Sequence, residues 1–232
     1  MADYNCAWPA RFEKLLNALM GSEVVRVTNL GNGGTSTGQG SVLVKYWMYP
    51  GDLAKYGPDV IVNSFSANDS LPPGWWLTGK DKPETIAGVR DAAWASNQHF
   101  IRTALSSAPC GTPPLVVHVD DYLGHQQDPV LGELQYNAAL TQLSRWYGTA
   151  FVSYADAVRD LVYADTAETT FSAPWPKAKD GTLKVDVHFG AAGHQAIAWA
   201  LAFAAIDAAV DYCQDAAHPA DSTEGGGLEA GR

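Results

Sequence analysis

The sequence predicts an α/β fold in which helices cover both faces of a mainly parallel sheet. Four short runs are rich in Val and hardly alternate between apolar and polar residues, as strands buried on both faces do. Helical patterns lie between and around these runs, and such an alternation is typical of a doubly wound sandwich with right-handed crossovers. A chain of 232 residues is long enough for one such domain with a substantial core.

Each predicted element has its own pattern. The first helix begins at Trp8 and carries apolar residues at helical spacing, the third ends in a turn at Gly148, and the last is rich in alanine. The predicted helices are Trp8–Met20, Glu84–Leu105, Gly132–Tyr147 and Gly193–Tyr212. The predicted strands are Val24–Asn29, Asp59–Phe65, Leu115–Asp120 and Ala150–Tyr154. We expect residues 1–213 to form one domain and the small, polar, acidic residues 214–232 to form a disordered tail.

Composition excludes several classes of function. A net charge of −10 without any cluster of Lys or Arg argues against nucleic acid and anionic membrane surfaces as partners. No apolar run reaches the roughly 18–20 residues that span a bilayer, and no signal peptide is recognisable, so the compartment is left open. Three scattered cysteines match neither a zinc site nor a disulfide framework, and we expect no metal and no cofactor.

The polar loops that follow the predicted strands are the candidate site, because ligands of such folds bind at the carboxyl ends of the strands. The first of these loops, Gly31–Gly40, lacks the lysine of a phosphate-binding loop. It contains Gly34-Thr-Ser36-Thr-Gly38, formally the Gly-x-Ser-x-Gly nucleophile elbow of α/β-hydrolases. An elbow turns sharply from strand into helix, whereas here polar residues precede Ser36 and no helix is expected after it.

Two further loops carry polar groups suited to catalysis. Asn68 follows the second predicted strand and can offer its amide N–H to an oxyanion, while Asp69 can brace the loop; the alternative is an ordinary Asx-turn. Asp186 and His188 lie two residues apart before the last predicted helix. A carboxylate beside an imidazole can orient the ring for proton abstraction, although an isolated Asp-x-His is more often an ordinary loop.

Taken together, these loops resemble the SGNH (GDSL-type) hydrolase family over roughly residues 8–212. The resemblance implies a flavodoxin-like three-layer α/β/α sandwich and serine esterase or deacetylase activity. It also implies that the Gly34 N–H and the Asn68 amide bind the oxyanion, that His188 is the base, and that Asp186 orients it. Two departures are visible: Ser66 replaces the glycine of the third block, and Asp186 stands two residues before the histidine instead of three.

The family's first block, Gly-Asp-Ser with its nucleophilic serine, is absent from the sequence. The first strand, an interior one in that family, is therefore expected to be missing, and the chain to be catalytically incomplete as given. Three explanations stay open: an N-terminally truncated chain, a chain complemented by another segment or working as a non-catalytic relative, and an altered nucleophile such as Ser36.

The resemblance predicts an ester hydrolase that acts on acetyl or short acyl esters, including esters on carbohydrate. The carbohydrate part rests on aromatic residues near the strand-end loops, Trp75, Trp76 and Tyr122, and Asp69 is added as a candidate substrate contact. The alternative is a non-catalytic binding module on the same fold. We expect His194 to be a helix-start residue that packs against the site instead of a second base.

Overall fold

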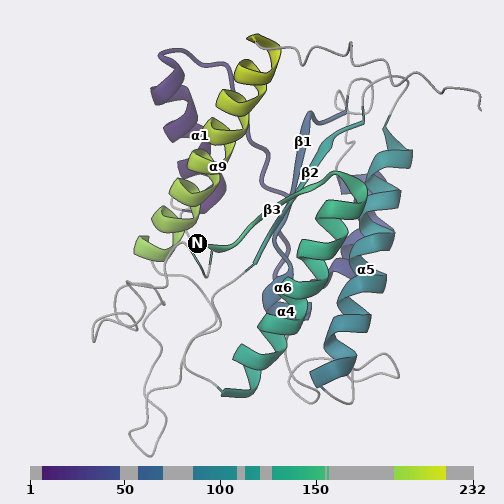
Figure 1. Ribbon diagram of the computed structural model, residues 1–232. Coiled ribbons are helices and arrows are strands. Elements are labelled where there is room, and N and C mark those ends of the chain that lie inside the picture. The colour runs from purple at the N-terminus through teal and green to yellow at the C-terminus, as the bar shows by residue number, and fades with distance from the viewer. Residues whose placement is uncertain are drawn as a thin grey trace, which may run out of the picture.

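A computed structural model describes residues 7–47, 57–69, 86–108, 113–120, 127–154, 156 and 191–217, and these residues form a three-layer α/β/α sandwich (Figure 1). Its sheet has the order β1-β2-β3 and is parallel throughout. The strands are β1 (Val60–Asn63), β2 (Leu115–Val119) and β3 (Ala150–Val152). In the register, Val60 is opposite Leu115 and Val117 is opposite Ala150. All three strands thus end at one edge of the sheet.

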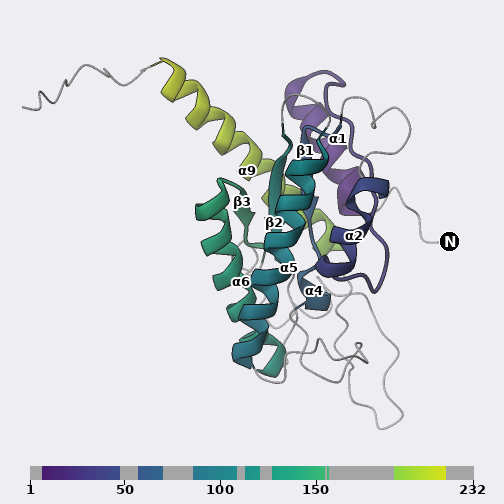
Figure 2. The ribbon, with the colours of Figure 1, turned by 90° about the vertical axis from the view of Figure 1, so that its right-hand side faces the viewer.

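Helices cover both faces of this sheet (Figures 1 and 2). One layer consists of α1 (Trp8–Met20) and α9 (Ala191–Ala217), and the other of α2 (Thr37–Trp47), α5 (Ile86–Ser107) and α6 (Gln127–Tyr147). A single helical turn, α4 (Ser66–Asp69), follows β1. None of the described helices is long and apolar enough to cross a membrane.

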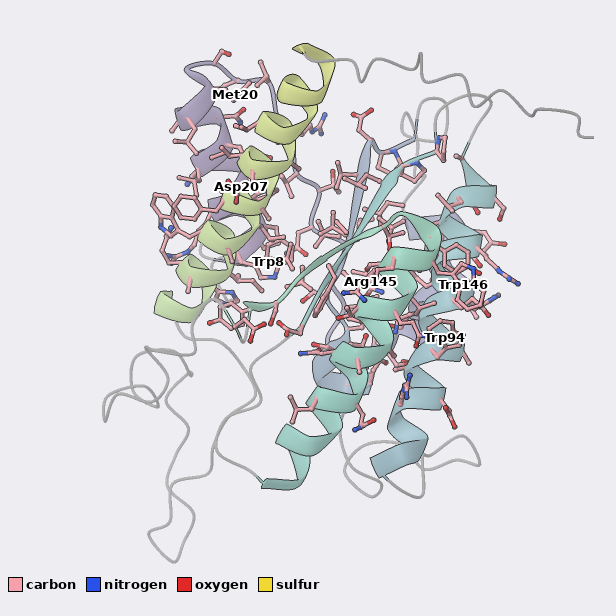
Figure 3. All side chains as sticks on the ribbon, viewed as in Figure 1. Trp8, Met20, Trp94, Arg145, Trp146 and Asp207 are labelled. Carbon is pink, nitrogen blue, oxygen red and sulfur yellow. The ribbon has the colours of Figure 1, made fainter. Side chains whose placement is uncertain are left out.

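The apolar clusters on the two faces of the sheet follow from the alternation of side chains along the strands. On β2, Val117 and Val119 pack with Ile197 and Leu201 of α9, whereas Val116 packs toward α5 and α6 on the opposite face. Figure 3 shows Trp8 on the α1–α9 side and Trp94 and Trp146 on the α5–α6 side. Burial on both faces explains why these strands are short Val-rich runs without polar alternation.

Most predicted elements agree with the structure. The first helix has the predicted bounds and ends at Gly21, whose positive φ of 67° lets its N–H bond to the carbonyl of Ala18. The three observed strands lie inside the predicted runs, and α5, α6 and α9 overlap their predictions. The last helix continues to Ala217, four residues into the segment predicted as a tail, and residues 218–232 lie outside the described part.

The predicted strand Val24–Asn29 is wrong: these residues are described and belong to no strand. A strand needs a ladder partner, and here side chains of α1 bind the backbone instead. The Asn17 side chain accepts the N–H groups of Val24 and Val25 at 2.9 and 2.8 Å, and Glu13 accepts the N–H of Val27. High β-propensity alone therefore did not place this run in the sheet.

The expectation that no helix follows Ser36 is also wrong, because α2 begins at Thr37. A capping box starts it: the Ser36 N–H donates to Gln39 Oε1 at 2.9 Å, and the Gln39 N–H lies 3.4 Å from Ser36 Oγ. The sequence Ser36-Thr-Gly-Gln39 carried this signal, but the surrounding glycines hid it.

Gly40 lets α2 pack closely against Phe65, which follows β1. A Cβ at this position would lie 2.7 Å from Cε2 of Phe65. The Phe65 ring packs edge-on against Phe100, with 6.4 Å between the two ring centroids. We expect Gly40→Ala to lower the free energy of unfolding by about 1–3 kcal/mol through overpacking, despite the roughly 1 kcal/mol that alanine gains in helix propensity. Urea unfolding measures this difference.

Gly38→Ala is the matched control, since a Cβ there would meet only Ser36 Oγ, at 3.9 Å. This variant should be as stable as the wild type or up to about 1 kcal/mol more stable. Equal unfolding midpoints for the two alanine variants would contradict the packing argument.

Candidate active site

Two loops that are far apart in sequence meet at the carboxyl edge of the sheet. Asn68 and Asp69 lie on α4, directly after β1, and residues 34–36 lead into α2 (Figure 2). The Asn68 Nδ2 donates to the carbonyl oxygen of Thr35 at 2.8 Å, and the Thr37 N–H donates to Asp69 Oδ1 at 3.0 Å. Two adjacent residues of α4 thus hold the loop of Gly34, and one of them, Asn68, is itself the second predicted oxyanion donor.

The Asn68 amide is oriented for a second donation. A side-chain amide has two N–H groups, and the Thr35 carbonyl engages one of them. This contact fixes the plane of the amide, so the remaining N–H has a defined direction. A donor that is held before substrate arrives is what stabilisation of a developing oxyanion requires.

Gly34 adopts a backbone conformation that favours glycine. Its φ is +76°, in the left-handed region, and the next N–H, that of Thr35, donates to the Asn32 carbonyl at 3.3 Å. Residues 32–35 therefore form a tight turn. Such a turn brings the backbone close to whatever occupies the strand ends and exposes backbone N–H groups to it.

Asp69 braces α2 from inside the protein. Its Oδ1 accepts the Thr37 N–H, and its Oδ2 accepts the Tyr136 hydroxyl at 3.0 Å. Burial raises the pKa of Asp69 to about 6, and the hydrogen bonds from Thr37 and Tyr136 act in the opposite direction. Both carboxylate oxygens are engaged by protein groups, so bracing is the observed role, and contact with substrate stays a prediction.

Ser36 caps helix α2, and its hydroxyl, the group that would act as nucleophile, takes part in the cap. Its hydroxyl lies 3.4 Å from both Gln39 N and Gln39 Oε1, within the capping box. The strand that an elbow requires before the serine is absent from residues 21–35. Among the described residues no histidine contacts this hydroxyl, and the geometry favours a structural role.

A buried polar network behind the site was missed by sequence reasoning. Asn63 at the end of β1 donates to Asn97 Oδ1 at 2.9 Å, and Asn97 donates to the Tyr136 hydroxyl oxygen at 3.2 Å. Asn63 Nδ2 also lies 3.2 Å from His118 Nδ1. These four residues are at most 1% exposed. The available signal was polar residues inside apolar elements, such as His118 within Leu115–Val119.

His118 is a neutral core histidine. Burial lowers its pKa to about 4. Because the Asn63 amide can only donate, Nδ1 accepts and the ring proton resides on Nε2. This Nε2 and Asn63 Oδ1 are buried with no hydrogen-bond partner among the described residues.

A second polar cluster lies at the ends of β2 and β3. Asp120 Oδ2 accepts the Asn137 amide and the Ser153 hydroxyl, both at 2.7 Å, and Ser153 Oγ accepts the Asp156 N–H at 3.0 Å. This cluster ties the exit of β3 to that of β2 and to α6. Its members were not among the predicted site residues.

His194 joins the starts of α1 and α9. Its Nδ1 accepts the Trp8 N–H at 3.3 Å, and the adjacent Gln195 accepts Arg11 at 2.9 Å. Burial, and secondarily the charge of Arg11, lower the pKa of His194. His194 thus lies in the first turn of α9, and its packing against the site stays a prediction.

The remaining predicted site residues, Asp186, His188, Trp75, Trp76 and Tyr122, lie outside the described residues. Within the described ranges, no group of three or more His, Cys, Asp or Glu side chains could hold a metal ion. The structure therefore describes the oxyanion side of the predicted site and its supports.

Residues 2–196 match the model of the GDSL-like Lipase/Acylhydrolase family. The chain belongs to this family. The resemblance predicted from the loops is thereby confirmed, as is the three-layer α/β/α fold. Among curated proteins, none is similar enough in sequence to count as a match.

Solved structures of esterases share the fold. The chain is similar to an acetylxylan esterase from Geobacillus stearothermophilus, with 17% identity, a TM-score of 0.60, and coverage of 84% of this chain and 78% of that one. It is also similar to an aryl esterase from M. smegmatis, with 15% identity, a TM-score of 0.56, and coverage of 88% and 86%. A carbohydrate acetylesterase from Sinorhizobium meliloti gives 16% identity, a TM-score of 0.53, and coverage of 88% and 86%.

Proposed function

We propose that this protein is a serine ester hydrolase that acts on acetyl and other short acyl esters, including esters carried on carbohydrate. The observation that carries the proposal is the hydrogen bond of Asn68 to Thr35, which orients an amide donor beside the Gly34 turn. Family membership supports ester hydrolysis. The carbohydrate part is supported by two similar structures that are an acetylxylan esterase and a carbohydrate acetylesterase.

The proposed mechanism is acyl transfer through a serine. The serine oxygen attacks the ester carbonyl while His188, oriented by Asp186, accepts the hydroxyl proton. The Gly34 N–H and the Asn68 amide stabilise the oxyanion. His188 then returns the proton to the leaving alkoxide as the ester C–O bond breaks. Water, activated by the same histidine, hydrolyses the acyl-serine to release the acid.

We propose further that the nucleophilic serine lies on a segment outside the 232 residues. The sequence contains no Gly-Asp-Ser, and the Ser36 hydroxyl is part of a capping box. Within the described sheet β1 is an edge strand, and an edge strand can accept a further strand. A segment that adds a strand beside β1 would bring the serine to the site. It would belong either to the same polypeptide or to a partner chain.

Covalent labelling tests the assignment of the nucleophile. Two proteins are compared: the 232-residue chain, and the product of the natural gene, meaning the full protein as the gene encodes it. Each is treated with a fluorophosphonate, and the labelled peptide is identified by mass spectrometry. We expect one labelled serine in the gene product, outside the 232 residues, and no labelling when His188 is replaced by alanine. The 232-residue chain should stay unlabelled.

Each other outcome selects an alternative. If Ser36 of the 232-residue chain is labelled and the label is lost in Ser36→Ala, the proposal of a serine outside the 232 residues is overturned. The nucleophile would then be Ser36 of the Gly-x-Ser-x-Gly elbow. Absence of both label and p-nitrophenyl acetate hydrolysis in the gene product would favour a non-catalytic binding module. Rates with acetyl, butyryl and acetylated xylo-oligosaccharide esters then define the substrate.

A further inference from the structure

We propose that Tyr136 is a positioning residue for the oxyanion donors, an inference that rests on the proposed function and deepens it. Tyr136 is 1% exposed on α6, and its hydroxyl stands between Asn97 of α5 and Asp69 of α4. Through Asp69 this hydroxyl holds the first turn of α2, and with it the loop that Asn68 grips. Nothing in the sequence pattern had marked Tyr136.

The direction of the hydrogen bonds commits the phenol proton to Asp69. The Asn97 amide nitrogen can only donate, so the Tyr136 oxygen accepts from it at 3.2 Å. The single phenol proton then goes to Asp69 Oδ2 at 3.0 Å. Asn97 is itself fixed, because its Oδ1 accepts from Asn63 and its Nδ2 also donates to the Ala93 carbonyl. A chain of oriented donors therefore ends on one oxygen of Asp69.

The other oxygen of Asp69, Oδ1, links Tyr136 to the loop of the oxyanion donors. Oδ1 accepts the N–H of Thr37, one of the N-terminal groups of α2 that have no partner inside the helix. The neighbouring Asn68 binds the carbonyl of Thr35, two residues earlier in the same loop. Asn68 and Asp69 thus clamp Thr35 and Thr37 together. A rotation of Asp69 would shift Asn68, and small displacements of positioned groups cost rate.

The charges around Asp69 suit this arrangement. Among the described residues, Tyr136 is the titratable group that contacts the carboxylate. Burial and the neighbouring Asp69 raise the pKa of Tyr136 well above its usual value of 10, so the phenol keeps its proton. The bond from Tyr136 lowers the pKa of Asp69 against the larger effect of burial. Removing the hydroxyl should therefore raise the pKa of Asp69 further.

The test compares Tyr136→Phe with Tyr147→Phe in the product of the natural gene. The control is closely matched, because Tyr147 also lies on α6 and its hydroxyl also binds side chains of α5, Gln98 and Arg102, both at 2.9 Å. For p-nitrophenyl acetate we expect Tyr136→Phe to lower kcat about tenfold, the rate equivalent of one lost hydrogen bond, with little change in KM. Tyr147→Phe should keep the wild-type kcat.

Two readouts in the 232-residue chain do not depend on activity. Tyr136→Phe should speed amide exchange of Thr37 about tenfold, again the equivalent of one hydrogen bond, and should raise the Asp69 pKa measured by carboxyl NMR. Neither should change in Tyr147→Phe. If the wild-type protein hydrolyses no ester, the proposed function is contradicted but the role of Tyr136 is not. That role is still tested by the amide exchange of Thr37 and the titration of Asp69.

Unchanged Thr37 exchange and Asp69 titration in Tyr136→Phe would overturn the proposal, as would equal changes in the control. If Tyr136→Phe does not fold, Asp69→Asn replaces it. The asparagine Oδ1 can still face Thr37, while its amide cannot accept the phenol proton. The same directions of change in kcat and exchange are expected, and wild-type behaviour of Asp69→Asn would refute the positioning role.

Discussion

Replacing Asn68 with alanine is expected to lower kcat for ester hydrolysis by about 10²–10³-fold, the loss typical of one oxyanion donor. The ground-state carbonyl of the substrate is neutral and binds the amide weakly, whereas the tetrahedral intermediate carries a negative charge. Removing the amide therefore affects the transition state more than substrate binding, and KM should stay close to the wild-type value. Steady-state kinetics on the natural gene product with p-nitrophenyl acetate measures both constants.

The same substitution also removes the bond to the Thr35 carbonyl, so the loss of rate needs a structural control. Asn29→Ala provides it. The Asn29 side chain accepts the Gly31 N–H at 3.0 Å in the same loop and is exposed to solvent. This variant loosens the loop without removing a predicted donor. We expect its kcat to stay within about twofold of the wild type, as surface changes usually do. Equal losses in both variants would assign the effect to loop order instead of oxyanion binding.

The elements that sequence could predict are those whose pattern is local. Helix α1 combines apolar residues at helical spacing with Gly21 at its end, and its predicted and observed bounds agree. The buried strands β1 and β2 were visible as Val-rich runs. Helix α2 was missed because glycines at positions 38 and 40 lower helix propensity, while its start depends on one capping box and its position on Phe65.

Long-range partners account for the other errors. The run Val24–Asn29 has the composition of a strand, but side chains of α1 bind its backbone, and no local signal reports that competition. In the site, too, residues with a local signal could be predicted and residues that depend on long-range contacts could not. Asn68 could be proposed from its place after a predicted strand, and Gly34 from the resemblance to the family. Tyr136 could not, because its contact with Asp69 spans 67 residues and depends on how α6 packs beside α4.

The buried network makes a separate prediction about stability. Asn97 is fully buried, and its side chain binds Asn63, Tyr136 and the Ala93 carbonyl. Asn97→Leu keeps the branched shape of the side chain but enlarges it, so overpacking at this fully buried position adds to the cost. The substitution would leave the Asn63 amide and the Tyr136 oxygen without this partner. At about 1–3 kcal/mol for each buried group left unsatisfied, we expect the free energy of unfolding to fall by about 2–5 kcal/mol.

Urea unfolding followed by tryptophan fluorescence measures this loss, with Gln142→Leu as the control. Gln142 is exposed on α6 and binds only Arg90 among the described residues, at 3.1 Å, so its replacement should change stability by less than about 0.5 kcal/mol. An Asn97→Leu variant within about 1 kcal/mol of the wild type would contradict the network, given the cost of stranded polar groups.

Combining Asn97→Leu with Tyr136→Phe separates the network from simple packing. The double variant removes the phenol that Asn97→Leu leaves without its donor, so the two losses should not add. We expect a favourable coupling of about 0.5–3 kcal/mol between the two positions, the range for residues in one hydrogen-bond network. Additive losses would mean that each residue contributes through its own packing. The coupling would show that Asn97 and Tyr136 act as one network, and the phenol of this network is the group that donates to Asp69.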